Sequence, residues 1–546
     1  MTRPPTAVDA VAERYVETFA ALDPCAATEL GIIGADVNYD EDLTDYSPVG
    51  VAARADAARD ALRQLESVEP VDAVDRVTIA AMRERLGVAV EFHDAGLDVG
   101  ELNVIASPLQ TLRDVFDLMA TDTDADWAVI SRRLARVPDR VNGYLAALRE
   151  TVRDGRAPAQ RQVARGITQA GSIQQLFVDM VATAPAANAA LRSELDRHAH
   201  DAAAAYAGLA DSLRTEIGPA ARDRDAVGRD EYRLFSRAFL GASVDLDETY
   251  AWGLQQLESI VAEQESIVTR LYPGASVAET LRRLDTEPRY VISGTDALQR
   301  WMQELSDRAV DALADTHFDI AEPLRRLECR IAPTQNGGIY YTGPSEDFTR
   351  PGRMWWSVPP GVEEFHTWQE TTTVFHEGVP GHHLQIGRAV SLAGELNRWR
   401  RLACWVSGHG EGWALYAERL MADLGWLDDA GARMGMLDAQ RFRAARVVID
   451  IGVHCGMTAP DGGVWDAGRA WEFLTTHSAM AEDNLRFELD RYLGWPGQAP
   501  SYAIGQRIWQ QLRDQTTAGG VSLKDFHSRA LDLGGLPLEV LSAAVR

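Results

Sequence analysis

The feature that most constrains the fold of this chain is an interrupted helix. Between Thr371 and Gln385 the sequence TTTVFHEGVPGHHLQ carries three histidines and a glutamate close to Pro380 and two glycines. Proline inside a helix clashes with the carbonyl four residues earlier and removes an N–H, and glycine permits backbone angles that other residues avoid. We therefore expect the helix that carries His376 and Glu377 to bulge or break before His382.

The spacing of the histidines shows what this interruption must achieve. On an ideal helix His376 and His382 would lie about 120° apart and about 9 Å along the axis, which is too far to hold one ion. His383 returns to the same face, but about 10.5 Å along the axis. If two residues are looped out, His382 takes the position one turn after His376, where two imidazoles can meet one ion. His382 is the expected second ligand and His383 the alternative.

A His-Glu pair followed by a second His is typical of zinc hydrolases, where the Glu activates a water molecule. The expected third ligand is Glu411 in GHGEGWALYAERL, brought back by a helix over Leu392–Val406 that returns antiparallel. Glu418, two turns further on, is expected to accept a hydrogen bond from a ligand imidazole. A solvent-exposed acidic helix is the alternative interpretation of both glutamates.

Composition restricts the partners. The 546 residues include 54 basic and 81 acidic ones, a net charge of −27, and binding of nucleic-acid phosphates would need clustered Lys and Arg. The sequence has no run of about 18 apolar residues, so we expect no membrane span. The charged N-terminus does not resemble a signal peptide, and the four cysteines have no C-x-x-C spacing. We expect a cytoplasmic protein with reduced thiols, as a monomer or homodimer.

Helical spacing of apolar residues dominates the chain, as in VDAVAERYVETFAAL and in the long helices expected over residues 247–271 and 294–318. The charged stretch at residues 218–232 predicts a boundary. The expected fold is mainly α, a large two-lobed body with a central cleft. Residues 1–225 would form one helical lobe and residues 226–546 the catalytic region.

A small β element is expected at residues 331–360. Here the turn pairs Asn336-Gly337, Gly343-Pro344 and Pro351-Gly352 separate short aromatic and β-branched runs, in the only convincing β stretch of the chain. A strand beside the active helix could hold a peptide by strand addition. The side chains expected to face that peptide are Tyr340, Tyr341, Arg350 and Arg353; the alternative is a hairpin packed over the core.

Two later segments supply further candidates. In RFRAARVVIDIGVH, Arg443, Arg446, Asp450 and His454 lie on one helical stripe that we expect to face the cavity, with His454 available to bind an oxyanion. In the C-terminal segment Tyr502 is the preferred oxyanion donor, with a buried aromatic role as the alternative. His409 and Arg491 are candidates for substrate binding, and His383 and Asp450 for support of the ligands.

The motifs HEGVPGHH, EGWALYAE, RAARVVIDIGVH, RYLGWPGQ and SYAIGQ resemble, over most of residues 230–510, a bacterial family known only as a domain of unknown function, number 885. That family in turn is similar to helical zinc oligopeptidases such as thimet oligopeptidase and neurolysin, and to carboxypeptidase Taq. The resemblance implies that His376 and His382 are the imidazole ligands, Glu377 the general base and Glu411 the third ligand. The chain departs from those peptidases by two residues between the ligands.

These observations predict a zinc-dependent metallohydrolase with one ion per chain, most simply a metallopeptidase acting on short peptides or small amides. One alternative is a metal-binding or ligand-binding protein whose Pro-Gly insertion has disabled hydrolysis. A second alternative is a hydrolase of a non-peptide amide or ester. The chain contains no P-loop, dinucleotide fingerprint or serine-nucleophile motif.

Overall fold

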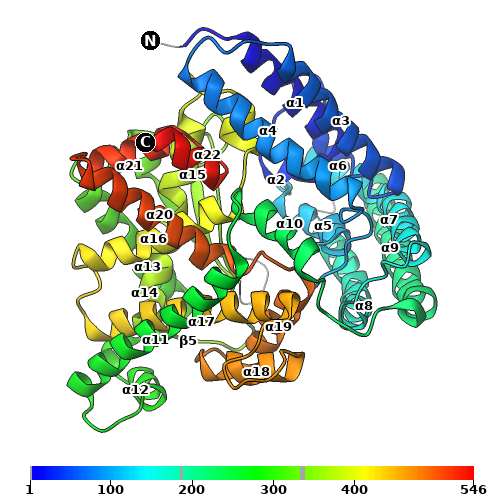
Figure 1. Cartoon of the computed structure of the whole chain (residues 1–546). Helices are drawn as coiled ribbons and strands as arrows, with labels where there is room; N and C mark the ends of the chain where they lie inside the picture. Colours follow the sequence, from blue (N-terminus) through cyan, green and yellow to red (C-terminus); the bar gives the residue numbers. More distant parts are fainter. Residues whose placement is uncertain (1–2, 185–187, 333–337) are drawn as a thin grey trace. The chain divides into compact units, whose positions relative to one another are not determined.

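The computed structural model describes residues 3–184, 188–332 and 338–546. Helices form most of this part of the chain and strands only a small part (Figure 1). The prediction of a mainly α fold is therefore confirmed. Contacts divide the chain into two compact units, one of Pro4–Val227 with Leu493–Trp495 and the other of Gly228–Tyr492 with Pro496–Arg546 and the N-terminal end.

In the described part of the first unit, helices are joined by turns and by loops such as residues 95–107. Buried apolar residues between Leu102 and Ile217, with Cys25 and Leu43, form its main core, in which Phe177 packs against Phe116 and Tyr206. Its helices are α1 Ala7–Leu22, α2 Pro24–Glu29, α3 Pro48–Glu66, α4 Ala73–Asp94, α5 Pro108–Asp114, α6 Asp124–Leu134, α7 Val137–Arg153, α8 Gln160–Ala182 and α9 Ala189–Ser212.

The second unit carries every residue of the candidate site. Its helices are α10 Arg229–Leu240, α11 Leu246–Leu271, α12 Val277–Leu284, α13 Thr295–Leu313, α14 Thr367–Glu377, α15 His382–Ser391, α16 Ser407–Asp423, α17 Ala430–Cys455, α18 Ala467–Thr476, α19 Glu482–Gly494, α20 Ser501–Ala518, α21 Leu523–Asp532 and α22 Leu538–Val545, of which the last residues of α19 belong to the first unit.

Helix α17 is the centre of the second unit. Val447, Val448, Ile449 and Ile451 are fully buried, and the helix packs against α11, α14 and α20. A Cβ atom at Gly435 would lie 2.2 Å from the carbonyl oxygen of Trp368. Only glycine therefore allows α17 to approach the start of α14 this closely.

A second close approach joins α16 to α20. A Cβ atom at Gly412 would lie 2.4 Å from the carbonyl carbon of Gly505. Because two glycines face each other, the two backbones nearly touch. This contact places Glu411 on α16 beside Tyr502 at the start of α20, and both line the same cavity.

The β structure differs from the expected hairpin. Strands β3 Ile339–Thr342 and β4 Gly352–Trp356 pair antiparallel, but β4 also pairs in parallel with β2 Leu327–Ile331. A second antiparallel pair joins β1 Val291–Ser293 to β5 Glu364–His366, so the idea of one β stretch was wrong. Strands β1 and β5 are each three residues long, which is too short to show a sequence period. The predicted Asn336-Gly337 turn lies outside the described residues.

The prediction of a helix over Leu392–Val406 was also wrong. The chain there forms turns and a single π-helical turn at Trp399–Ala403, which is enough to return it to α16.

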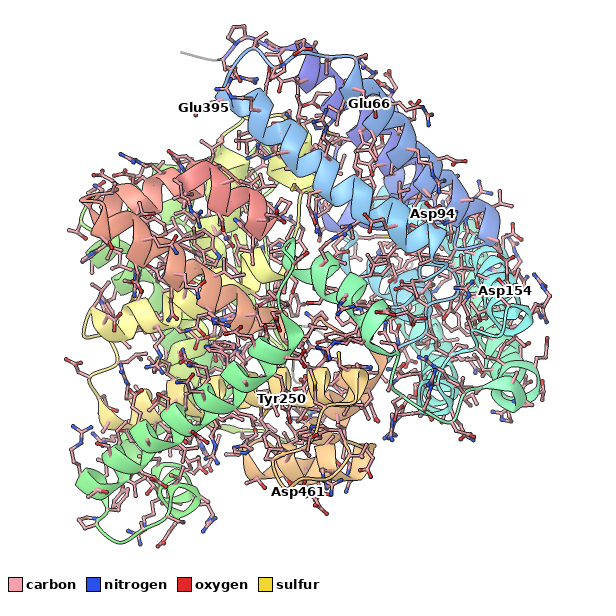
Figure 2. The ribbon with its side chains drawn as sticks, in the orientation of Figure 1. Glu66, Asp94, Asp154, Tyr250, Glu395 and Asp461 are labelled. Carbon is pink, nitrogen blue, oxygen red and sulfur yellow. The ribbon has the colours of Figure 1, made fainter. Side chains whose placement is uncertain are left out.

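Acidic side chains at exposed helix ends and loops, such as Glu66, Asp94, Glu395 and Asp461, carry part of the negative charge (Figure 2). Cys25, Cys329, Cys404 and Cys455 are free thiols. Among the described helices, none is both long enough and apolar enough to cross a bilayer.

Candidate metal centre and active-site cavity

The interruption after Glu377 is a complete break into two helices. Helix α14 ends at Glu377, the Val379-Pro380 peptide bond is cis, and α15 begins at His382. A Cβ atom at Gly381 would lie 1.9 Å from the carbonyl oxygen of His376, so no other residue fits there. The sharp return brings the rings of His376 and His382 to 4.9 Å between centroids, nearly perpendicular to each other.

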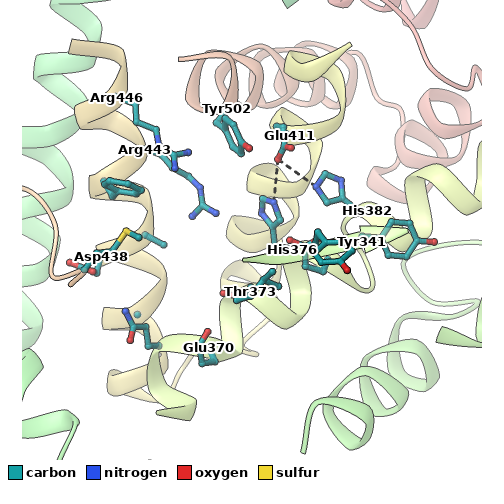
Figure 3. Close-up of a pocket in the computed structure, with 18 of the residues that line it drawn as sticks. Tyr341, Glu370, Thr373, His376, His382, Glu411, Asp438, Arg443, Arg446 and Tyr502 are labelled. Carbon is teal, nitrogen blue, oxygen red and sulfur yellow. Dashed lines mark ion pairs between the residues drawn. The ribbon is translucent and has the colours of Figure 1, made fainter. Parts of the chain in front are cut away.

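Three ligand-type side chains meet at this break. Glu411 Oε2 lies 3.4 Å from His376 Nε2 and 3.5 Å from His382 Nε2 (Figure 3). The two nitrogens and the carboxylate oxygen all lie within 4.8 Å of one another. His383 is not part of this group, so of the two alternatives for the second imidazole the geometry favours His382.

Two of the three spacings, 3.4 and 3.5 Å, are compatible with a tetrahedral zinc site. Tetrahedral bonds of about 2.0–2.1 Å separate two ligand atoms by about 3.4 Å. The charges at the site also favour a cation. Burial alone would lower the pKa of His376, but hydrogen bonding to Glu411 and Glu418 raises it to about 9. Burial would raise the pKa of Glu411, yet His382 and His376 hold it well below its usual range. The site thus stabilises a positive charge at the point where the three side chains converge.

Glu418 fixes the orientation of His376. Its Oε1 accepts a hydrogen bond from His376 Nδ1 at 2.8 Å, and its Oε2 accepts one from Thr372 Oγ1 at 2.8 Å. The carboxylate is fully buried. Because Nδ1 donates to Glu418, Nε2 is the ring nitrogen that faces Glu411 and that, once deprotonated, can bind a metal ion. His382 has no matching support, since its buried Nδ1 lacks a partner within the described residues.

Replacing Glu418 by Gln should therefore weaken zinc binding about 10- to 100-fold, because the histidine loses a charged acceptor. Competition with a chromophoric chelator measures the affinity. Asp423→Asn, an exposed acidic position at the end of the same helix, is the matched control and should bind zinc normally. Equal affinity in Glu418→Gln and wild type would remove the supporting role of Glu418.

A cavity of about 550 Å³ opens in front of the three side chains (Figure 3). One wall is a face of α14, a second is the Gly435–Arg446 part of α17, and a third carries apolar and aromatic side chains. The lining side chains include Gln369, Glu370, Thr373, Glu377, Asp438, Phe442, Arg443, Arg446, Tyr502, Ile339, Tyr340, Tyr341, Ile386 and Trp405.

Glu377 has the environment of a proton acceptor. Its side chain is buried but lines the cavity, and it makes no hydrogen bond to another described residue. Burial raises its pKa, and His376 and His382 oppose that shift. A carboxylate that faces the cavity with a free acceptor and a raised pKa is suited to general-base chemistry.

Tyr502 lies across the cavity on α20. The guanidinium carbons of Arg446, Arg491 and Arg443 are 5.0, 5.9 and 6.0 Å from the centre of its ring. Burial and the charge of Glu411 raise the pKa of its phenol, so it stays protonated and able to donate a hydrogen bond.

Of the predicted strand residues, both tyrosines line the cavity. Tyr340 stacks on Trp355 and is partly exposed. Tyr341 donates its hydroxyl to His383 Nδ1 at 2.9 Å, while His383 Nε2 donates to the carbonyl oxygen of Leu324 at 2.8 Å. Burial lowers the pKa of His383 to about 4, so this neutral imidazole joins the sheet to α15.

The two strand arginines do not line the cavity, which corrects their expected contact with substrate. Arg350 donates to the carbonyl oxygen of Gly343, and Arg353 pairs with Glu328. Alternation along β4 and the bend before it turn both side chains to other neighbours.

Arg491 and His409 are also outside the lining. Arg491 is committed to Glu488 and Gln498. His409 accepts a hydrogen bond from Gln385 Nε2 and packs on Trp509. Burial and Arg400 lower its pKa to about 3.

Of the four side chains on the predicted stripe of α17, two line the cavity. Arg443 and Arg446 line the cavity. Asp450 instead accepts hydrogen bonds from the hydroxyl of Tyr232 and the amide of Gly497, and His454 donates to the carbonyl oxygen of Tyr492. A helix of 26 residues extends about 39 Å, so its far end leaves the cavity and enters the core.

Glu370, Asp438 and Trp405 are among the lining residues that the sequence analysis did not single out. Burial raises the pKa of Glu370 to about 7 and that of Asp438 to about 6, and the ring of Trp405 lies 6.3 Å from that of His382. The spacing of Glu370 two turns before Glu377 on one helix face was a usable signal. For Asp438 and Trp405 no local signal exists.

Comparisons with known proteins place the chain in a family. The model of the family described as "Bacterial protein of unknown function (DUF885)" matches residues 24–545. The chain belongs to the DUF885 family. No protein of the curated collection matches it.

Two solved structures share the fold. One is a crystal structure described as that of a candidate lipoprotein from Colwellia psychrerythraea, with 20% identity, a TM-score of 0.86 and 99% of each chain covered. The other is a candidate lipoprotein of unknown function from Shewanella oneidensis, with 14% identity, a TM-score of 0.74 and 99% of each chain covered. At these identities the DUF885 chain shares their fold, and the likeness carries no function.

Proposed function

We propose that this protein is a zinc-dependent hydrolase that cleaves an amide bond in short peptides. The observation that carries the proposal is the convergence of His376, His382 and Glu411, with Glu377 on the wall of the same cavity. The resemblance of the motifs to helical zinc oligopeptidases agrees with it. The cavity volume of about 550 Å³ lies in the range of small-ligand sites, about 300–1,000 Å³.

The side chains can be given roles in this reaction. His376, His382 and Glu411 would hold zinc, which would supply Lewis acidity for the carbonyl group and the water. Glu377 takes a proton from the attacking water and delivers it to the leaving nitrogen as the C–N bond breaks. The phenol of Tyr502 donates a hydrogen bond to the oxygen that gains negative charge. Glu418 keeps His376 oriented throughout.

Elemental analysis and a peptide library test this function. The purified chain should contain one zinc ion, lose cleavage of the library on treatment with a chelator and regain it on addition of zinc. Mass spectrometry of the products identifies the bonds cut. Stoichiometric zinc with no cleavage of any peptide would favour a metal-binding protein or a hydrolase of another amide or ester. Absence of zinc binding would contradict the proposal as a whole.

A further inference from the structure

Three arginines surround Tyr502, but their hydrogen bonding differs. Arg446 donates to the hydroxyl of Tyr492 at 2.8 Å and to Glu488 at 2.9 Å. Arg491 donates to Glu488 and to Gln498. These two guanidinium groups share the single carboxylate of Glu488, and each also donates to a neutral protein acceptor. Both residues are buried, and their positions are held by these protein partners.

Arg443 is the exception. Its charged contact is with Glu418 Oε1 at 3.7 Å, which is beyond hydrogen-bond length. Both oxygens of Glu418 already accept hydrogen bonds of 2.8 Å from His376 and Thr372. The guanidinium of Arg443 makes no hydrogen bond to any described residue, although its side chain is only 18% exposed. Its five N–H donors are thus available.

The position of Arg443 makes these donors useful. Its side chain lines the cavity and reaches from α17 toward the His376 side of the three ligands (Figure 3). The side of His382 is different, because the ring of the 47% exposed Trp405 lies 6.3 Å from it, and Ile339 and Ile386 add apolar surface to the lining. A ligand that spans the metal centre therefore meets an arginine on one side and apolar surface on the other.

From this arrangement we infer that Arg443 binds a carboxylate group of the substrate on one side of the cleaved bond. An apolar side chain of the substrate lies on the other side of that bond, against the apolar wall. An arginine matches a carboxylate with two parallel N–H···O bonds. The carboxylate can be the free C-terminus of a short peptide or an acidic side chain next to the cleaved bond. The inference deepens the proposed function, since it names the chemical class of the substrate.

Other charged groups of the cavity agree with a carboxylate on this side. Glu370 and Asp438 are the remaining acidic groups of the α14 and α17 walls besides Glu377. They precede His376 and Arg443 on their helices by six and five residues, which is about 9 and 7.5 Å along the axes. In their ionised forms these two groups repel a substrate carboxylate, which favours a position near Arg443.

Binding rather than turnover tests the inference. We would use the full chain with zinc and the Glu377→Gln substitution, and titrate three probes by calorimetry: acetyl-Phe-Ala with a free carboxylate, its C-terminal amide, and acetyl-Phe-Asp amide. We expect a carboxylate probe to bind about 10- to 100-fold more tightly than acetyl-Phe-Ala amide. Preference for acetyl-Phe-Ala identifies a C-terminus as the ligand, and preference for acetyl-Phe-Asp amide identifies a side chain.

Substitution of Arg443 completes the test. Arg443→Gln should abolish the preference while leaving the affinity for the neutral amide within about twofold, and Arg443→Lys should keep part of it. Arg433→Gln is the matched control, because that arginine of the same helix pairs with Glu263 and does not line the cavity. It should keep the full preference.

Two outcomes would overturn the inference, and neither depends on catalysis. One is equal affinity for all three probes in the Glu377→Gln protein that retains Arg443. This outcome can be observed even if no Arg443 variant folds. The other is an unchanged preference in Arg443→Gln, which would assign the carboxylate to the metal or to another group. A carboxylate preference that depends on Arg443, in a chain whose wild type cleaves no peptide, would contradict the proposed hydrolysis but not the inference.

Discussion

Replacing Glu377 by Gln should reduce kcat for peptide cleavage about 10²- to 10⁴-fold while zinc content stays at one ion per chain. Gln has the shape of Glu but cannot accept the proton of the attacking water. Glu377 is not one of the three converging ligand residues, so the metal should remain bound. Single-turnover kinetics together with elemental analysis of the same sample measure both quantities.

A second acidic residue of the same helix provides the control for this result. Glu370 lines the same cavity two turns earlier, and Glu370→Gln should change kcat far less, because this carboxyl is remote from the three ligands. Full activity in Glu377→Gln would remove Glu377 as the base. An equal loss in both variants would indicate that charge in the cavity, rather than proton transfer, is what matters.

Replacing His376 by Ala should abolish stoichiometric zinc binding and, with it, all cleavage. Two of three protein ligands cannot hold the ion in competition with a chelator. The loss should also appear in stability, because an ion present at about 1,000 times its Kd stabilises the folded state by about 4 kcal/mol. The rise in melting temperature on adding zinc to the metal-free protein should vanish in the variant.

Substitutions of His382 and His383 distinguish a zinc ligand from a residue that only supports the structure. His382→Ala should behave like His376→Ala, because its Nε2 lies 3.5 Å from Glu411. His383→Gln should lower the melting temperature by disturbing the contacts with Tyr341 and Leu324, yet it should still bind one zinc ion. Zinc lost from His383→Gln but retained in His382→Ala would reverse the assignment of the second ligand.

Much of the fold followed from local sequence signals. Helices such as α11 and α13 lie close to the predicted ranges, because a 3.6-residue apolar period reports which face of a helix is buried. The short strands β1 and β5 were missed, since three residues contain no measurable period. The segment over Leu392–Val406 was predicted wrongly because helical composition alone does not show that turns and a π-helical turn suffice to reverse the chain.

For the site, the sequence by itself determined the residue types and the break. Pro380 and Gly381 cannot continue a helix, so His382 had to leave the axis of α14, and this is a local backbone effect. The motif around Glu411 was likewise visible without a structure.

Only the tertiary structure decided which side chains share the cavity. Arg443 and His454 lie on one predicted stripe of α17, yet the first lines the cavity and the second bonds to the backbone of Tyr492. The difference comes from the elements packed against each residue: Tyr502 of α20 lies beside Arg443, whereas Tyr232 of α10 and Tyr492 of α19 cover His454. Such packing depends on contacts between residues far apart in the chain, at Gly435 and Gly412, which no periodicity within a single helix encodes.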